Sequence, residues 1–304
     1  MKKILFPILA LVLAIGMTIP MARPFASPAY ANSSGLVAGN DVEDRSNGPD
    51  SWVNFYIVDT NNPFNADGRA TQWEIYVGRI MPVQLYIYRY DGSAWSVVGT
   101  SDVITPTTLG TNTYPLTTPI TVQAGDFVGL HYPSMSGQGG AVDYTLWGTN
   151  LYYDTISGPV IFTCQEPTGP TAFEYSSDRI YSIRVTGDIA VDIDIKPGSD
   201  PNSINLGSNG VVPVAILGSP DFDAATVDPF SVELAGSQVR LKGKSGNAGS
   251  LKDVNEDGFL DLVVQVCTSG LLLVEGSSEA VLTADLNGGG TIYGVDTANI
   301  VKGP

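Results

Sequence analysis

Asp253-Val-Asn-Glu-Asp-Gly-Phe-Leu-Asp-Leu-Val-Val264 is the stretch that decides between a helical and a β-rich interpretation of this chain. Oxygen-bearing side chains recur along it, at Asp253, Asn255, Asp257 and Asp261. A hard cation such as Ca²⁺ takes about six to eight oxygen ligands, and Gly258 permits the sharp turn that such a loop needs. The spacing therefore predicts a calcium loop, with the carbonyl of Phe259 as a further ligand. The alternative is an Asp- and Asn-rich turn without metal.

The residues after the loop predict a strand rather than a helix. An EF-hand has a bidentate Glu at its twelfth position, where this sequence has Val264. Residues 261–267 are β-branched and apolar, a composition typical of strands. A loop followed by a strand resembles the calcium motif of FG-GAP and VCBS repeats, and resembles a dockerin less, since a dockerin has a helix there. Glu279, on a later predicted strand, is the candidate for closing the ligand shell.

The region 51–187 consists of short aromatic and β-branched runs separated by Gly, Pro and Asn, with no sustained helical period. Such runs predict strands. The predicted strands cover residues 52–58, 70–77, 83–90, 95–100, 112–116, 120–122, 127–132, 142–147, 160–164, 172–175 and 180–185. Residues 91–94 predict a hairpin turn. This number of short strands favours a jelly-roll-like β-sandwich. The role we expect for it is that of a binding domain.

The region 188–304 predicts a second β domain, so the fold class is all-β with two sandwich-like domains. Predicted strands cover residues 191–196, 211–217, 232–234, 238–241, 260–267, 279–286 and 291–294. Pro213 predicts an edge strand or a bulge. Residues 221–228 predict one helical turn, and residues 287–290 a flexible hairpin. No repeat period is present, so the calcium loop is expected once rather than in every blade of a propeller.

Two segments of the second region carry a family resemblance. They are Ile193-Asp-Ile-Lys-Pro-Gly-Ser-Asp-Pro-Asn-Ser-Ile-Asn-Leu-Gly207 and Val211-Val-Pro-Val-Ala-Ile-Leu-Gly218. Together with the calcium loop, residues 190–301 resemble an accessory module near the C-termini of many secreted proteins of environmental bacteria. The resemblance implies a secreted, β-rich, calcium-loop-bearing domain and no particular reaction. Residues 51–187 are similar only in general terms to jelly-roll carbohydrate-binding and adhesive modules.

The N-terminus predicts secretion, because Lys2 and Lys3 precede an apolar run from Ile4 to Met21, and a small-residue cleavage site, Ala29-Tyr30-Ala31, follows. Residues 1–31 are the expected signal peptide, and residues 32–50 the expected flexible leader. Without the signal, 12 basic side chains face 31 acidic ones, a formal net charge of −19. This charge argues against nucleic acid and anionic lipid as partners. No later segment is apolar enough to span a membrane. The expected location is outside the cell or on its surface.

The two cysteines, Cys164 and Cys267, form a disulfide or remain free thiols. His131 is the only histidine, so multi-histidine zinc sites are excluded, and a Ser-His-Asp triad would have to use this residue. The simplest interpretation of His131 is a non-catalytic strand residue that forms a local hydrogen bond.

Two further groups are candidate binding residues. An earlier oxygen-rich loop forms a second calcium site or a plain solvated loop, through Asp59, Asn61, Asn65 and Asp67. A stacking platform for sugar rings is the second candidate, formed by Tyr86, Tyr88, Tyr90 and Trp95. The alternative is that these rings pack inside the sandwich. Val83, Leu85 and Ile87 lie on the other face of the same strand and are the better core candidates.

These features together predict a secreted, non-catalytic calcium-binding protein that binds extracellular glycan or matrix through its first domain. One alternative is a structural or interaction protein of the cell envelope. Another is a calcium-dependent polysaccharide hydrolase or lyase, which needs two carboxylates about 5–10 Å apart. The sequence places no two carboxylates face to face.

Overall fold

The computed structural model describes residues 35–45, 47–51, 54, 56–133, 140–142, 144–146, 160–244 and 246–301. The predicted signal peptide, residues 1–31, lies outside these ranges. The described chain is all-β, as predicted, and its helical residues form only two short 3₁₀ turns. Within the described ranges, no helix has the length and apolar composition needed to cross a membrane.

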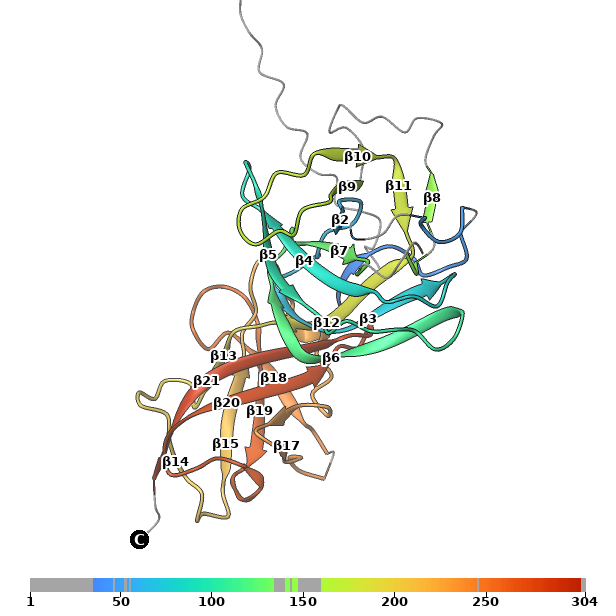
Figure 1. The fold of residues 1–304 in the computed structure, drawn as a ribbon. Helices are drawn as coiled ribbons and strands as arrows, with labels where there is room; N and C mark the ends of the chain where they lie inside the picture. Colours follow the sequence, from blue (N-terminus) through green and yellow to red (C-terminus); the bar gives the residue numbers. More distant parts are fainter. Residues whose placement is uncertain are drawn as a thin grey trace, which may run out of the picture.

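The strands that precede residue 191 form the first half of the molecule (Figure 1). They are β1 (Leu36–Gly39), β2 (Tyr56–Asp59), β3 (Gly68–Val77), β4 (Gln84–Tyr90), β5 (Trp95–Thr100), β6 (Gly110–Val122), β7 (Phe127–His131), β8 (Tyr144–Leu146), β9 (Val160–Thr163), β10 (Tyr175–Ser177), β11 (Arg179–Tyr181) and β12 (Ile183–Ala190).

The second half contains the remaining strands and both 3₁₀ turns. They are β13 (Ile193–Ile195), β14 (Ser203–Asn205), β15 (Val211–Ile216), η1 (Ala224–Thr226), β16 (Glu233–Leu234), β17 (Ser237–Gln238), β18 (Gly249–Lys252), β19 (Asp261–Cys267), η2 (Thr268–Gly270), β20 (Gly276–Asp285) and β21 (Thr291–Val301). The predicted helical turn is η1, and the predicted hairpin over residues 287–290 connects β20 to β21.

Each half is a sandwich with its own apolar core. In the first half a six-stranded sheet, ordered β10-β9-β2-β7-β4-β5, packs against β1, β3, β6 and β12. The side chains of Val83, Leu85 and Ile87 point into this core, as the alternation in β4 predicted. In the second half a four-stranded sheet, ordered β13-β15-β19-β18, packs against β20 and β21.

One nine-stranded sheet runs through both sandwiches, because β12 pairs in parallel with β21. The paired residues are Asp188–Ala190 and Thr291–Tyr293. Arg69 of β3 reaches across this join: its Nε lies 2.7 Å from Asp188 Oδ2, and its guanidinium lies 4.3 Å from the centre of the Tyr293 ring. The two halves therefore share backbone hydrogen bonds as well as side-chain contacts.

Three local predictions differ from the structure. The leader is not loose where it is described, because residues 36–39 form β1, pair with β12 and bury Leu36 in the first core. The predicted strands over residues 112–116 and 120–122 are one continuous strand, β6, which includes Pro115 and Pro119. This strand lies at the edge of its sheet, where a missing N–H is tolerated. Pro213 lies in an inner strand, β15, next to Val214, whose pair with Ile195 is the last between β15 and β13. Its carbonyl still accepts the N–H of Lys196 at 2.8 Å.

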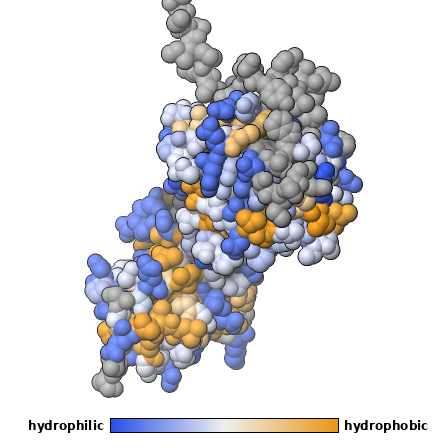
Figure 2. Space-filling model, viewed as in Figure 1, coloured by the Kyte–Doolittle hydropathy of each residue, from blue (hydrophilic) through white to orange (hydrophobic). Residues whose placement is uncertain are grey.

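The outer face of β20 and β21 carries exposed apolar side chains (Figure 2). Val281 and Val295 are directly opposite each other on this pair of strands, and both are exposed. Their neighbours Ala280 and Leu282 are buried in the second core. Alternation along a strand explains the contrast, because successive side chains point to opposite faces.

Candidate functional site

The loop from Asp253 to Leu260 connects β18 to β19 and folds around the carboxylate of Asp253. Asp253 Oδ1 accepts the backbone N–H of Glu256 at 2.7 Å, and Oδ2 accepts that of Gly258 at 3.0 Å. Both donor residues have positive φ, 63° for Glu256 and 94° for Gly258, and glycine adopts such a conformation without steric cost. The sequence thus places its one glycine where the loop turns.

Asn255 and Asp257 form two successive turns on the exposed side of this loop. The N–H of Asp257 donates to Asn255 Oδ1 at 3.2 Å, and the N–H of Phe259 donates to Asp257 Oδ1 at 2.9 Å. Asn255 Nδ2 donates to Asp257 Oδ2 at 2.8 Å. These side chains therefore support the backbone while their oxygens stay close to solvent.

Asp261 is buried and anchors the loop to the rest of the second half. Its Oδ2 accepts the N–H of Val254 at 2.7 Å, and its Oδ1 accepts the N–H of Gly218 at 2.9 Å. A Cβ at Gly218 would lie 2.4 Å from the carbonyl oxygen of Leu260, so the loop rests directly on this glycine. The predicted ligand Asp261 is thus also the residue that fixes the loop to the end of β15.

The donor chemistry of the loop fits a calcium ion. Carboxylate, amide and carbonyl oxygens are the ligands that Ca²⁺ prefers. A carboxylate has about four lone-pair sites, so an oxygen that accepts one N–H can still bind a cation. Asp253, Asn255, Asp257 and the Phe259 carbonyl would hold the ion. Among the described residues, however, no three His, Cys, Asp or Glu side chains gather into a cluster that could hold a metal ion.

Glu279 does not complete this loop, contrary to the prediction. It is exposed on β20, and the adjacent residue Ala280 points into the second core. Glu279 therefore points away from that core, whereas the loop belongs to the opposite sheet of the sandwich. The sequence showed an acid on a strand but not which face of which sheet it would occupy.

The earlier oxygen-rich loop directs its side chains to separate partners. They are Asp59, Asn61, Asn65 and Asp67. Asp59 is buried and accepts the N–H groups of Asn61 and Tyr181, at 3.0 and 3.2 Å. Asn65 Oδ1 accepts the N–H of Val37, and Asp67 Oδ1 accepts that of Ala124. In this arrangement the side chains join β1, β2, β11 and the turn before β7, and they do not surround one point.

The tyrosine face, which was a candidate stacking platform, is covered. Tyr86, Tyr88 and Trp95 are at most 8% exposed, and only Tyr90 remains accessible, at 41%. The cover includes Phe173, whose ring lies edge-on to Tyr88 at 5.6 Å. The aromatic rings therefore form a third apolar cluster on the outer side of the six-stranded sheet. Alternation in β4 could not reveal this cover, which comes from a segment more than 80 residues later in the sequence.

His131 lies at the edge of this aromatic cluster. Its ring stacks on Tyr56, with centroids 4.0 Å apart and planes 6° apart. Neither ring nitrogen has a hydrogen-bond partner within the described part of the chain. Burial lowers the pKa of His131 to about 4, so the ring is neutral at neutral pH. The predicted local hydrogen bond is not present, and the described residues offer no serine or aspartate partner for a catalytic triad.

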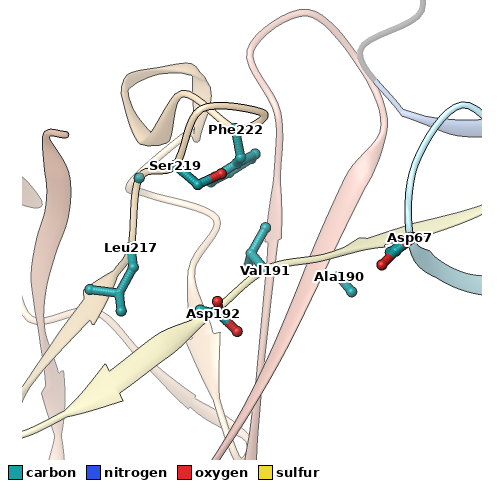
Figure 3. Close-up of a pocket in the computed structure, with 8 residues that line it drawn as sticks. Asp67, Ala190, Val191, Asp192, Leu217, Ser219 and Phe222 are labelled. Atoms are coloured by element: carbon teal, nitrogen blue, oxygen red, sulfur yellow. The ribbon is translucent and has the colours of Figure 1, made fainter. Parts of the chain in front are cut away.

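A cavity of about 240 Å³ lies at the join between the two halves (Figure 3). Its lining comes from distant parts of the sequence: Asp67, Ala190, Val191, Asp192, Leu217, Gly218, Ser219 and Phe222. Of these, only Asp67 was a predicted site residue, and it was predicted for a different site. No spacing rule could have found the others as a group, because their proximity depends on backbone hydrogen bonds between distant segments: Ala190 N–H donates to the Asp67 carbonyl, and Leu217 N–H donates to the Asp192 carbonyl.

Both cysteines are free thiols: Cys164 is exposed and Cys267 is partly buried. The disulfide alternative is therefore excluded in this structure, and the two halves are joined by the shared sheet instead. The chain matches no protein-family model, and it has no significant match among curated proteins. Any functional interpretation consequently rests on the residues and their geometry.

Proposed function

We propose that this chain is a secreted, non-catalytic calcium-binding protein that binds extracellular glycan or matrix. The acidic composition and the predicted signal peptide support an extracellular location. The loop from Asp253 to Asp261 supports calcium. Glycan binding is the proposed role of the first half and of the surfaces next to it, although Tyr86, Tyr88 and Trp95 are unavailable for stacking.

The observation that carries the proposal is the closure of the loop around Asp253 together with its anchorage through Asp261 to Gly218. A cation held there would tie the β18–β19 connection to the end of β15. Its effect would be on the folded state, because the unfolded chain cannot hold the oxygens together. Calcium is therefore proposed as a structural ion.

Removing calcium tests this role. Binding that is specific to the folded state adds about 2.7 kcal/mol of stability when the free ligand is 100 times its dissociation constant. We expect chelation to lower the melting temperature measured by circular dichroism, and Asp257→Ala to abolish most of that response. Asp285→Ala, which removes another exposed acid from the same half, is the matched control. Equal melting curves with and without calcium would contradict the proposal.

The glycan part needs its own experiment. The full chain with calcium is mixed with insoluble cellulose, chitin, xylan and mannan, and the bound fraction is measured. Retention on at least one of them supports the proposal, and retention on none refutes glycan binding. Release of reducing ends or of unsaturated sugars in the same mixtures would instead identify a hydrolase or lyase and would refute the non-catalytic part.

A further inference from the structure

The cavity at the join has walls from both halves of the molecule. Figure 3 shows the segment from Ala190 to Asp192 crossing the site, with Asp67 on one side and the loop carrying Ser219 and Phe222 on the other. Ligand sites occur preferentially at such boundaries, because two units meet there without filling the space between them. Two backbone hydrogen bonds hold these walls together: Ala190 N–H donates to the Asp67 carbonyl at 2.9 Å, and Leu217 N–H donates to the Asp192 carbonyl at 2.9 Å.

The charge of the cavity restricts its ligand. Two carboxylates, Asp67 and Asp192, line it, and its lining contains no Lys, Arg or His. Asp67 uses Oδ1 to accept the N–H of Ala124 at 2.8 Å, which leaves its second oxygen for a ligand. Within the described ranges, no hydrogen bond engages the carboxylate of Asp192, which is exposed. Phosphates, sulfates and uronic acids are therefore disfavoured, and a ligand that donates hydrogen bonds is favoured.

The apolar part of the lining favours a flat ligand with a hydrocarbon face. Phe222 is half-buried on the loop after β15, and Val191 and Leu217 complete an apolar wall. A volume of about 240 Å³ equals about eight water molecules at ~30 Å³ each, and it is smaller than the ~300–1,000 Å³ of sites for drug-sized ligands. A single sugar ring has this size, hydroxyl groups for the carboxylates and C–H groups for the aromatic face.

We propose that this cavity binds one ring of a neutral sugar. The proposal rests on the proposed function and gives it a site and a ligand class. Hydroxyl groups donate to Asp67 and Asp192, and the sugar face lies against Phe222. Gly218 belongs both to the cavity and to the contact with Asp261 Oδ1, so the calcium loop supports one wall. Calcium thus positions the wall and does not contact the sugar.

The experiment titrates the full chain, with calcium present, against neutral gluco-, xylo-, manno- and chito-oligosaccharides, followed by NMR or calorimetry. Glucuronic acid oligomers are the charged comparison. Asp192→Ala and Phe222→Leu test the cavity; the leucine keeps apolar packing and removes the flat ring. Asp221→Ala is the control, since Asp221 is an exposed acid beside the cavity but outside its lining. A folded circular dichroism spectrum is required of each variant.

The expected result is binding of a neutral oligosaccharide that weakens at least about tenfold in both cavity variants and is unchanged in the control. The proposal would be overturned by no binding of any neutral oligosaccharide, by equal affinity in all variants, or by a preference for glucuronic acid oligomers. A calcium ion bound at Asp192 in place of sugar would also overturn it. If the chain still binds an insoluble glycan while the cavity variants are unaffected, the general function stands and only this site fails.

Discussion

Asp59 at the end of β2 and His131 at the end of β7 are both buried polar side chains, but their surroundings differ. Asp59 accepts four hydrogen bonds, one from Asn40, two from Asn61 and one from the backbone of Tyr181. Burial raises its pKa, and those hydrogen bonds oppose the rise. His131 has ring contacts instead, with Tyr56 and Tyr86. Burial lowers the pKa of His131, so its charged form is disfavoured in that position.

The titration of His131 predicts a loss of stability in acid. Its pKa is about 4 in the folded chain and about 6.5 in the unfolded chain. Below pH 6.5 the unfolded state therefore binds a proton that the folded state does not, and the resulting loss grows until the pH reaches about 4. The loss amounts to at most about 3 kcal/mol.

His131→Phe keeps a ring against Tyr56 and removes the titration. Urea unfolding at pH 7, 5.5 and 4 should show a smaller loss in this variant than in the original chain. The carboxylates titrate in both proteins, so the difference between the two isolates His131. Identical pH dependence in the two proteins would show that His131 is not held neutral by its surroundings.

Turns illustrate what the sequence determines at the scale of an element. The hairpin between β20 and β21 was predicted from Asn287-Gly-Gly-Gly290, and the structure has positive φ at Gly289 and Gly290, of 96° and 88°. A local pattern sufficed here, because glycine alone adopts these angles freely. The turn sets the register of ten paired residues on each strand.

Gly289→Ala should destabilise the protein by about 1–2 kcal/mol, because an L-residue is strained at this φ. No atom lies within 4 Å of the position its Cβ would take, so the effect would come from the backbone alone. Gly169→Ala is the control, since that site is equally open and lacks a positive φ. Chemical unfolding measures both, and equal stabilities of the two variants would contradict the argument.

The elements that the sequence did not predict depend on distant partners. Strands β14 and β18 are short and only partly apolar. Each is a strand because of its partner: β14 pairs with β21, and β18 pairs with β19. The covered face of Tyr86 and Tyr88 and the cavity at Asp192 have the same origin. Period and composition report how one segment divides its side chains between two faces. They do not report which segment will lie against each face.

At the scale of the whole molecule, the two cores are connected by one sheet. Both cores include Ile189 of β12 among the residues packed against them. The first half therefore depends on the second for the pairing of Asp188–Ala190 and for the contact of Arg69 with Tyr293. Two sandwiches joined in this manner are expected to unfold together.

The tryptophans provide the test, because all four precede residue 188. Leu282→Ala removes a fully buried side chain from the second core, at a cost of about 2–5 kcal/mol. We expect the fluorescence-monitored transition of the first half to shift to lower denaturant concentration together with far-UV circular dichroism. Val281→Ala, at the exposed neighbouring position, should shift neither signal much. A fluorescence transition that stays unchanged in Leu282→Ala would show that the halves unfold independently.

The parallel pairing of β12 with β21 also bears on how this chain can be exchanged between proteins. A recombination boundary near Gly187 would separate the two cores in the sequence but would leave an unpaired strand edge on each fragment. Such edges promote aggregation. The two sandwiches are thus expected to be inherited, transplanted and expressed as one unit.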